Sequence, residues 1–328
     1  MASHIHWERN IGRRFQLREL HVFFTVADRG SMAKAAVELG ITQPSVSAVI
    51  ASLETSLGVR LFDRGPGGVE PTPFGRALLT RVQAAFDELR QGVKDIEFLS
   101  EANTGEVKVG CPESVAAGFL PAVINLLSQQ YPRVSLVVAS VDTPTLDFRE
   151  LAERKLDLVL ARLATPEPKN LPADYAAEIL FDDRFCIVAG ERSPWGRLRK
   201  IDIADLAEEP WIVTPPDTPG TSWIADAFRA RGVEFPKRCI TTYSAHIRNN
   251  LIATGRFVGT MPESAFDLAA GRFGLKALPL ELPVPRWPIA VVTLRNRILS
   301  PVVNLFLECA RTVAKTKVKP NRRYGGAA

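Results

Sequence analysis

The sequence of 328 residues has few of the features that mark secreted, membrane or metal-binding proteins. No apolar run is long enough to cross a bilayer, and residues 1–15 lack the apolar segment of a secretory signal. We therefore expect a cytoplasmic protein without a membrane partner. The four cysteines are far apart, with no C-x-x-C pair and no neighbouring histidine, which indicates reduced thiols rather than a zinc site. They are Cys111, Cys186, Cys239 and Cys309.

Signatures of catalysis and of cofactor binding are also missing from the sequence. It contains no G-x-G-x-x-G, no P-loop, no nucleophile elbow G-x-S-x-G and no H-E-x-x-H. His246 is the only histidine in the second half, so few groups remain for acid–base or nucleophilic catalysis. We therefore expect neither an enzyme nor a bound cofactor or metal ion.

Positive charge is unevenly distributed along the chain. The formal net charge is +5, but residues 17–74 carry five basic and six acidic side chains, a net charge of −1. The excess lies in residues 311–328, with six basic side chains and no acidic one. The basic balance is therefore no argument for nucleic-acid binding by the N-terminal part. Residues 1–16 are expected to be a disordered lead-in, and residues 319–328 a basic tail.

Two helical patterns meet at a tight corner within residues 31–58. Apolar residues recur at helical spacing on both sides of the corner. Between them, Gly40 has the conformational freedom that a turn requires. Thr42 is suited to cap the second helix, and Pro44 to stand in its first turn, where its missing N–H is not needed.

The spacing of small and apolar residues around this corner is that of a helix-turn-helix. Ala36 is small, as a residue must be where the second helix crosses close to the first. Val46 is apolar and would fill the angle between the two helices. Two packed helices in an ordinary α domain would share part of this pattern.

The flanking segments extend the pattern to a winged helix. Residues 17–30 predict a preceding amphipathic helix, and VRLFDRGPGGVEPTPFG after Gly58 predicts two short strands around a Pro-Gly-Gly turn. Residues 17–75 as a whole resemble the N-terminal domain of the LysR-type transcriptional regulators. The matching motifs are L-x-x-L…F, G-S-M-A-K-A-A, T-Q-P-S-V-S, L-E-x-x-L-G-V-R-L-F-x-R and P-T-x-x-G.

This resemblance implies a winged helix-turn-helix domain over residues 17–74 that binds double-stranded DNA. Its recognition helix would run from Thr42 to about Ser56 and enter the major groove. Several positions where relatives often carry Arg or Lys hold small residues here, so we expect weaker affinity per subunit and more reliance on oligomerisation. Phosphate anchoring then falls to a few basic side chains and to helix N-terminal amides. The residues expected at the DNA are Ser31, Lys34, Thr42, Gln43, Pro44, Ser45, Ser47, Ala48, Arg60, Arg64 and Thr72.

A long helix is predicted from Phe74 to Leu99, followed by a hinge at residues 101–105. Its apolar residues approximate a heptad seam. In the LysR-type family the corresponding helix forms the dimer interface, which implies a homodimer or homotetramer with recognition helices about one DNA turn, ~34 Å, apart. A helix lying on its own sensor domain is the alternative. Residues 75–104 form this linker, and its expected seam is Leu78, Val82, Ala85, Leu89, Val93 and Ile96.

The rest of the chain alternates short strands with helices, the pattern of an α/β fold with parallel sheets. It resembles the effector domain of the same family, which is similar to periplasmic solute-binding proteins. That resemblance implies two Rossmann-like lobes within residues 105–318, joined by crossovers near residues 163–178 and 280–287. Lobe I would contain residues 105–170 and 287–318, and lobe II residues 171–286. We expect one helix over Ser114–Gln130, and a strand near Ala177–Phe181 in the second lobe.

Ligands of open α/β sheets bind beyond the carboxyl ends of the strands, which predicts an effector site between the lobes. Ser114 would serve either as a helix cap alone or as a ligand contact as well, and His246 either lies on the surface or contacts the ligand. Arg162 would clamp a carboxylate or pair with Asp142 or another acid. Glu113 argues against a strongly anionic ligand unless Arg162 offsets it. A small organic acid or an aromatic metabolite fits best. The expected residues are Pro112, Glu113, Ser114, Thr143, Arg162, Thr218, Thr221, Ser244 and His246.

These features together predict a sequence-specific DNA-binding transcriptional regulator controlled by a small-molecule effector. The resemblance implies that effector-driven closure of the lobes changes the spacing of the recognition helices, with RNA polymerase as a further partner. The alternative is a cytosolic small-molecule-binding protein or an enzyme in which the helical N-terminal domain is only an interaction module.

Overall fold

The structure is a computed structural model that describes residues 16–65, 68–101, 103–141, 148–163, 171–280, 282 and 287–317. The chain divides into two compact units, Met1–Gly92 and Val93–Ala328. Most of the expected lead-in, the basic tail and the candidate effector residue Thr143 lie outside the described residues.

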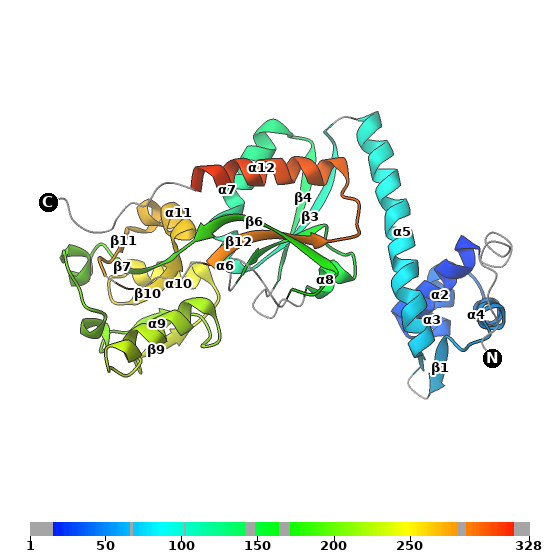
Figure 1. Cartoon of the computed structure of the whole chain (residues 1–328), viewed down its shortest axis with the longest axis horizontal. Helices are drawn as coiled ribbons and strands as arrows, with labels where there is room; N and C mark the ends of the chain where they lie inside the picture. The colour runs from blue at the N-terminus through cyan, green and yellow to red at the C-terminus, as the bar shows by residue number, and fades with distance from the viewer. Residues whose placement is uncertain are drawn as a thin grey trace. The chain divides into compact units, whose positions relative to one another are not determined.

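The N-terminal unit is a small helical domain with a two-stranded hairpin. Helices α2, α3 and α4 gather around the N-terminal part of α5 (Figure 1), and they share one apolar core with Val82 of that helix. Each of the three short helices ends at a glycine in the left-handed conformation: Gly30, Gly40 and Gly58. The elements are α2 (Leu17–Arg29), α3 (Met32–Leu39), α4 (Gln43–Leu57), β1 (Phe62–Gly65), β2 (Gly68–Pro71) and α5 (Pro73–Ser100).

The hairpin is held against the helices by backbone contacts. Strands β1 and β2 pair antiparallel, and the backbone N–H of Val69 donates to the Gly30 carbonyl at 2.9 Å. A Cβ at Gly68 would lie 2.3 Å from that same carbonyl oxygen, so only glycine permits this approach. Glu54 of α4 accepts from the N–H groups of Leu61 and Phe62 at 2.7 and 3.2 Å. The predicted winged helix-turn-helix is thus confirmed.

The first lobe of the second unit is built on a five-stranded sheet of order β4-β3-β5-β12-β6. Strands β3, β4 and β5 are parallel, and β12 runs antiparallel to β5 and β6. Helices α7 and α12 cover one face (Figure 1) and share its core, while Phe148 and Leu151 pack on the other. The elements are β3 (Gly105–Cys111), α6 (Glu113–Ala116), α7 (Leu120–Gln130), β4 (Val134–Ser140), α8 (Arg149–Ala152), β5 (Leu158–Arg162), β6 (Tyr175–Asp183), β12 (Trp287–Leu294) and α12 (Pro301–Lys317).

The second lobe has its own five-stranded sheet, of order β11-β7-β10-β8-β9. Helix α9 packs on one core cluster, which includes Trp211 and Phe228. A second cluster joins Ile252 of α10 and Ala269 of α11 to the same sheet. The elements are β7 (Phe185–Gly190), the 3-10 helices η1 (Pro194–Arg197) and η2 (Ile203–Leu206), β8 (Trp211–Val213), α9 (Pro219–Ala230), β9 (Cys239–Thr241), α10 (Ala245–Ala253), β10 (Val258–Pro262), α11 (Glu263–Phe273) and β11 (Leu275–Ala277).

The single helix expected over Ser114–Gln130 is wrong, because the structure divides it into α6 and α7. Pro121 lies inside the expected helix, where proline removes a hydrogen bond and clashes with the preceding turn. The chain therefore starts a new helix with this proline in its first turn. The break places Gly118 where a Cβ would lie 2.7 Å from the backbone nitrogen of Ala265 in α11.

The strand expected near Ala177–Phe181 exists but belongs to the other sheet. It is part of β6, which pairs antiparallel with β12 in the first lobe. The chain then passes to the second lobe at Arg184, because β7 begins at Phe185. The first crossover thus lies after residue 183, not within residues 163–178. Strand pairing is set by long-range contacts, which a local apolar pattern does not specify.

Candidate DNA-binding surface and effector site

Helices α3 and α4 form the corner expected of a helix-turn-helix. They are bent by 110° relative to each other, within the range typical of this motif. The Ser31 hydroxyl caps α3 by accepting from the Lys34 N–H, and the Thr42 hydroxyl caps α4 by accepting from the Ser45 N–H. Val46 and Ala36 are both buried in the angle, as their sizes predicted.

The first turns of α4 present polar side chains to solvent. The exposed polar side chains are those of the cap Thr42, Gln43 and Ser45. Also exposed are Pro44 and Ala48 of the same helix and Lys34 on α3. Arg60 and Arg64 are exposed as well, before and within β1. These residues lie on the elements that a helix-turn-helix directs toward DNA.

Two of the residues expected at the DNA make hydrogen bonds within the domain. Thr72 is 6% exposed, and its hydroxyl donates to the Arg60 carbonyl and accepts from the Gly75 N–H. This side chain therefore joins the start of α5 to the segment before β1. Ser47 is half-buried and its hydroxyl donates to Met32 Sδ at 3.3 Å, so it joins α4 to α3.

The expected seam on α5 has two parts. Val82 is buried in the core of the N-terminal domain, and the half-buried Leu78 packs against that core. Ala85 is exposed, and Leu89, Val93 and Ile96 are 52%, 56% and 64% exposed. The exposed side chains continue the apolar spacing along the second half of the helix.

Within the second unit, the two lobes meet where α6 approaches α10 and α11. Glu113 Oε1 accepts from the backbone N–H of Ala245 at 3.2 Å, which joins α6 to the first turn of α10. Gly118 lies against Ser264 and Ala265 at the start of α11. We call these contacts the lobe interface. It brings the predicted residue Glu113 next to Ser244, the cap of α10.

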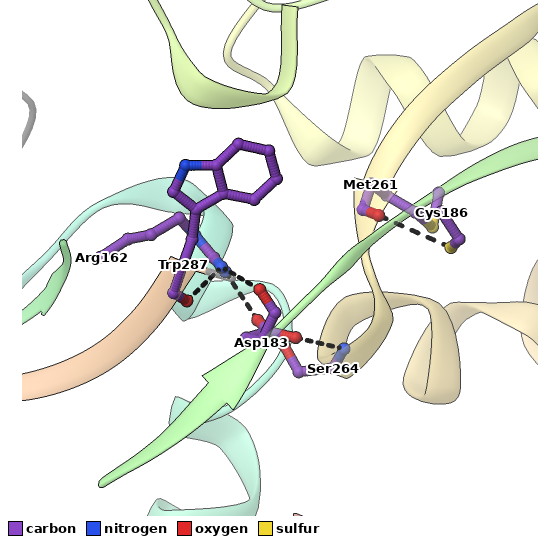
Figure 2. Close-up of polar contacts among 6 residues, drawn as sticks. All are labelled: Arg162, Asp183, Cys186, Met261, Ser264 and Trp287. Carbon is purple, nitrogen blue, oxygen red and sulfur yellow. Dashed lines mark hydrogen bonds and ion pairs between the residues drawn. The ribbon is translucent and has the colours of Figure 1, made fainter. Parts of the chain in front are cut away.

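Arg162 lies at the point where the chain crosses between the lobes (Figure 2). Its Nη2 contacts Asp183 Oδ2 at 2.6 Å, and both side chains are almost fully buried. Asp183 also accepts from the backbone N–H and the hydroxyl of Ser264, at 3.1 and 2.7 Å. Of the two roles considered for Arg162, the structure shows pairing with an acid, and that acid is Asp183.

Aromatic rings complete this group, which we call the crossover cluster (Arg162, Asp183, Phe185 and Trp287). The Arg162 guanidinium lies 5.0 Å from the centre of the Phe185 ring, and this ring meets Trp287 edge-on at 4.9 Å. A Cβ at Gly220 of α9 would lie 2.8 Å from Phe185. Asp183, Phe185 and Trp287 were not predicted as site residues, because nothing in their local sequence indicates that they meet Arg162 or one another.

The threonine side chains in and just after the loop before α9 hydrogen-bond to one another. Thr218 and Thr221 are buried, and both hydroxyls contact the hydroxyl of Thr214. Thr218 donates to the Pro215 carbonyl and Thr221 to the Thr214 carbonyl, each at 2.7 Å. These bonds hold the loop in shape, so the two residues support the site from within the loop.

The other candidate effector residues differ in their surroundings. Pro112, not Ser114, is the cap of α6, and Ser114 lies inside that short helix, which corrects the expectation of a Ser114 cap. Ser244 caps α10 by accepting from the Ile247 N–H. His246 is exposed, with only Asn250 as a hydrogen-bond partner among the described residues.

Among the described residues, no group of three His, Cys, Asp or Glu side chains could hold a metal ion. No single helix in the described part of the chain is long and apolar enough to span a membrane. Only the bent pair α3–α4 passes by length and composition together, and both helices contribute buried apolar side chains to the domain core.

Comparisons with known proteins match both units. The family model "Bacterial regulatory helix-turn-helix protein, lysR family" matches residues 17–76, and "LysR substrate binding domain" matches residues 100–315. The dual regulator GltC of Bacillus subtilis is 28% identical over 293 residues, covering 89% of this chain and 95% of GltC. The regulator YdcI of Escherichia coli is 27% identical over 299 residues, covering 91% and 96%.

Solved structures share the fold. A full-length variant of OxyR from Pseudomonas aeruginosa matches with a TM-score of 0.63 at 22% identity, covering 92% of this chain and 97% of that one. Full-length BenM matches with a TM-score of 0.50 at 23% identity, covering 94% and 100%. Family models and relatives together span the helix-turn-helix and the two-lobed domain. The chain therefore belongs to the LysR family of DNA-binding transcriptional regulators with a substrate-binding domain.

Proposed function

We propose that this chain binds a specific DNA operator as an oligomer, and that a small molecule held between its two lobes controls this binding. The observation that carries the proposal is the exposed first turn of α4 beyond the 110° corner with α3. A helix presented in this way can enter the major groove with its N-terminal side chains at the base edges.

The residues of the proposed DNA-binding surface fall into two groups: those that contact base edges and those that contact phosphates. Gln43 and Ser45 carry groups that hydrogen-bond to base edges, and Ala48 can meet a thymine methyl group. Lys34, Arg60 and Arg64 supply charge to the phosphates. The first turns of α3 and α4 begin at Ser31, Thr42 and Pro44, and we propose that their backbone amides face the phosphates of the DNA. Ser47 holds α4 in place through its contact with Met32.

The effector side of the proposal rests on the lobe interface. Glu113 reaches across to α10, so a ligand that strengthens or breaks this contact would change the angle between the lobes. A small organic acid or an aromatic metabolite remains the ligand class. We place this activity in the cytoplasm, with RNA polymerase as the partner at the promoter and without a catalytic step.

The test is binding to a labelled DNA fragment from the region beside the protein's own gene. Fluorescence anisotropy is measured over a salt series with non-specific competitor DNA. Gln43→Ala is expected to weaken specific binding about tenfold, since one good base contact is worth about 1–3 kcal/mol. Thr55→Ala, an exposed change near the other end of α4, is the matched control and should stay within about twofold.

Each contrary result points to a different error. Equal affinity of Gln43→Ala and Thr55→Ala would remove Gln43 from the recognition surface. Loss of all binding on addition of competitor would mean that non-specific charge alone had bound the DNA. In that case the proposal of a specific operator in this fragment fails.

A further inference from the structure

Arg248 is a buried cation that is not among the effector-binding residues expected from the sequence. It lies on α10, one turn after Ala245, and is 5% exposed. Its Nε and Nη2 are buried and have no hydrogen-bond partner among the described residues. A guanidinium carries only donors, and a buried charge without acceptors is strongly unfavourable. A partner that brings acceptor oxygens would remove this penalty.

The neighbours of Arg248 place its guanidinium at the lobe interface. It lies on the buried side of α10 with Ala245 and Ile252; Ile252 packs on the second sheet, and Ala245 contacts Glu113 of the other lobe. Burial lowers the pKa of Arg248 to about 10, and the charge of Glu113 opposes this shift. The side chain is therefore protonated at neutral pH and close enough to Glu113 to feel its charge.

The two groups whose charges act on Arg248, Glu113 and Cys186, make hydrogen bonds elsewhere. Glu113 is exposed and directs Oε1 to the Ala245 N–H. Cys186, which also interacts with Arg248, is a neutral thiol because burial raises its pKa, and it donates to the Met261 carbonyl (Figure 2). None of these groups supplies an acceptor to Nε or Nη2 of Arg248.

The two orphaned nitrogens indicate the shape of the missing partner. Nε and Nη2 lie on one edge of the guanidinium plane, where two parallel N–H groups match the two oxygens of a carboxylate. We propose that this edge of Arg248 binds a carboxylate of the effector, so that the ligand is a small organic acid anchored to α10 at the lobe interface. This inference rests on the proposed function, because it names the ligand chemistry of the same site.

An anionic ligand beside Glu113 requires a positive charge that offsets the charge of this carboxylate. Arg162 is neutralised by Asp183, so it does not offset Glu113. Arg248 provides the positive charge that an anionic ligand requires beside Glu113. A ligand bound there would join α10 of the second lobe to α6 of the first.

The experiment uses the full chain and formate, the smallest carboxylate, as the probe. The melting temperature is measured as formate replaces chloride at constant ionic strength. A site that binds formate in the folded state gives a saturable rise in Tm. The apparent Kd is expected to rise more than about tenfold in Arg248→Met, equal to about 1.4 kcal/mol. Arg256→Met, an exposed arginine just beyond the same helix, is the control and should respond as the wild type.

The behaviour without formate separates ligand binding from a structural role. In chloride, Arg248→Met should melt at or above the wild-type temperature, because an unpaired buried charge is replaced by an apolar side chain. A lower Tm that persists in Arg248→Lys, which keeps the charge, would assign Arg248 a packing role and overturn the proposal. Equal formate responses in wild type and Arg248→Met, or no response in either, would overturn it as well.

Two further measurements test whether the site prefers a carboxylate over another anion, and whether binding at this site controls DNA binding. Sulfate is titrated in the same way, and an Arg248-dependent response stronger than that to formate would overturn the assignment to a carboxylate. Specific DNA binding is then measured with formate in the same variants. If a ligand alters DNA binding independently of Arg248, the inference fails while the proposed function stands. If formate binds through Arg248 but DNA binding never changes, the anion site stands and effector control fails.

Discussion

Single residues at the crossover determine how rigidly the two lobes are joined. Arg162 and Asp183 are buried charges, and such pairs are tolerated only when their mutual attraction and additional hydrogen bonds offset the loss of water. Ser264 of α11 contributes two of these hydrogen bonds. One carboxylate thus connects β5, the β6–β7 crossover and α11.

Removal of this carboxylate should strongly destabilise the second unit. Asp183→Ala leaves the buried charge of Arg162 without its carboxylate, and we expect a loss of about 3–5 kcal/mol in the free energy of unfolding. Glu178→Ala is the matched control, because its pair with Arg311 is exposed and such pairs contribute less than about 1 kcal/mol. Urea unfolding measures both, and similar losses in the two variants would contradict the role assigned to the buried pair.

At the scale of elements, the turn between α6 and α7 packs closely against the start of α11. A Cβ on Gly118 would lie 2.6 Å from Ser264 Oγ and 2.7 Å from the Ala265 backbone nitrogen. The break in the expected 114–130 helix is therefore not only a consequence of Pro121. It also presents a residue without a side chain to the other lobe.

Gly118→Ala should separate α11 from this turn. Overpacking of such a contact costs about 1–3 kcal/mol, so we expect a lower Tm and faster hydrogen exchange at the start of α11. Gly271→Ala is the matched control, because a Cβ there meets nothing within 4 Å and alanine favours a helix by about 1 kcal/mol. If Gly118→Ala were as stable as Gly271→Ala, the lobe interface would not be closely packed at this position.

At the scale of the whole molecule, the distribution of charge and the exposed apolar side chains both favour a dimer. Residues 17–74 carry a net charge of −1, so the net charge of this domain does not attract it to DNA. The second half of α5 leaves Leu89, Val93 and Ile96 exposed. A dimer along this half of α5 would cover the apolar side chains and double the number of DNA contacts.

Leu89→Asp should therefore weaken self-association. Loss of one buried leucine contact is worth about 2 kcal/mol, or about thirtyfold in the dimer Kd. Analytical ultracentrifugation measures the change, with Thr80→Asp on the same helix as the control for an added charge on an exposed position. A Leu89→Asp protein that dimerises as tightly as Thr80→Asp would exclude this part of α5 from the interface.

The sequence by itself determined those features that depend on neighbours along the chain. The α3–α4 corner follows from Ala36, Gly40, Thr42 and Val46, since helix caps, glycine turns and the 3.6-residue period are local. The same holds for α5, which the apolar pattern predicts from Phe74 to Leu99 and which runs from Pro73 to Ser100. The family, too, could be predicted from these ordered motifs.

Only the tertiary structure decided which distant residues meet. The pairing of β6 with β12, the partner of Arg162 and the burial of Arg248 each depend on segments more than twenty residues apart, or on the approach of one lobe to the other. Likewise, the local sequence around a threonine that precedes a helix does not show whether its side chain is exposed, as in Thr42, or buried, as in Thr72. Burial and ion pairing are properties of the folded whole, because desolvation depends on everything that surrounds a group and not on its neighbours in sequence.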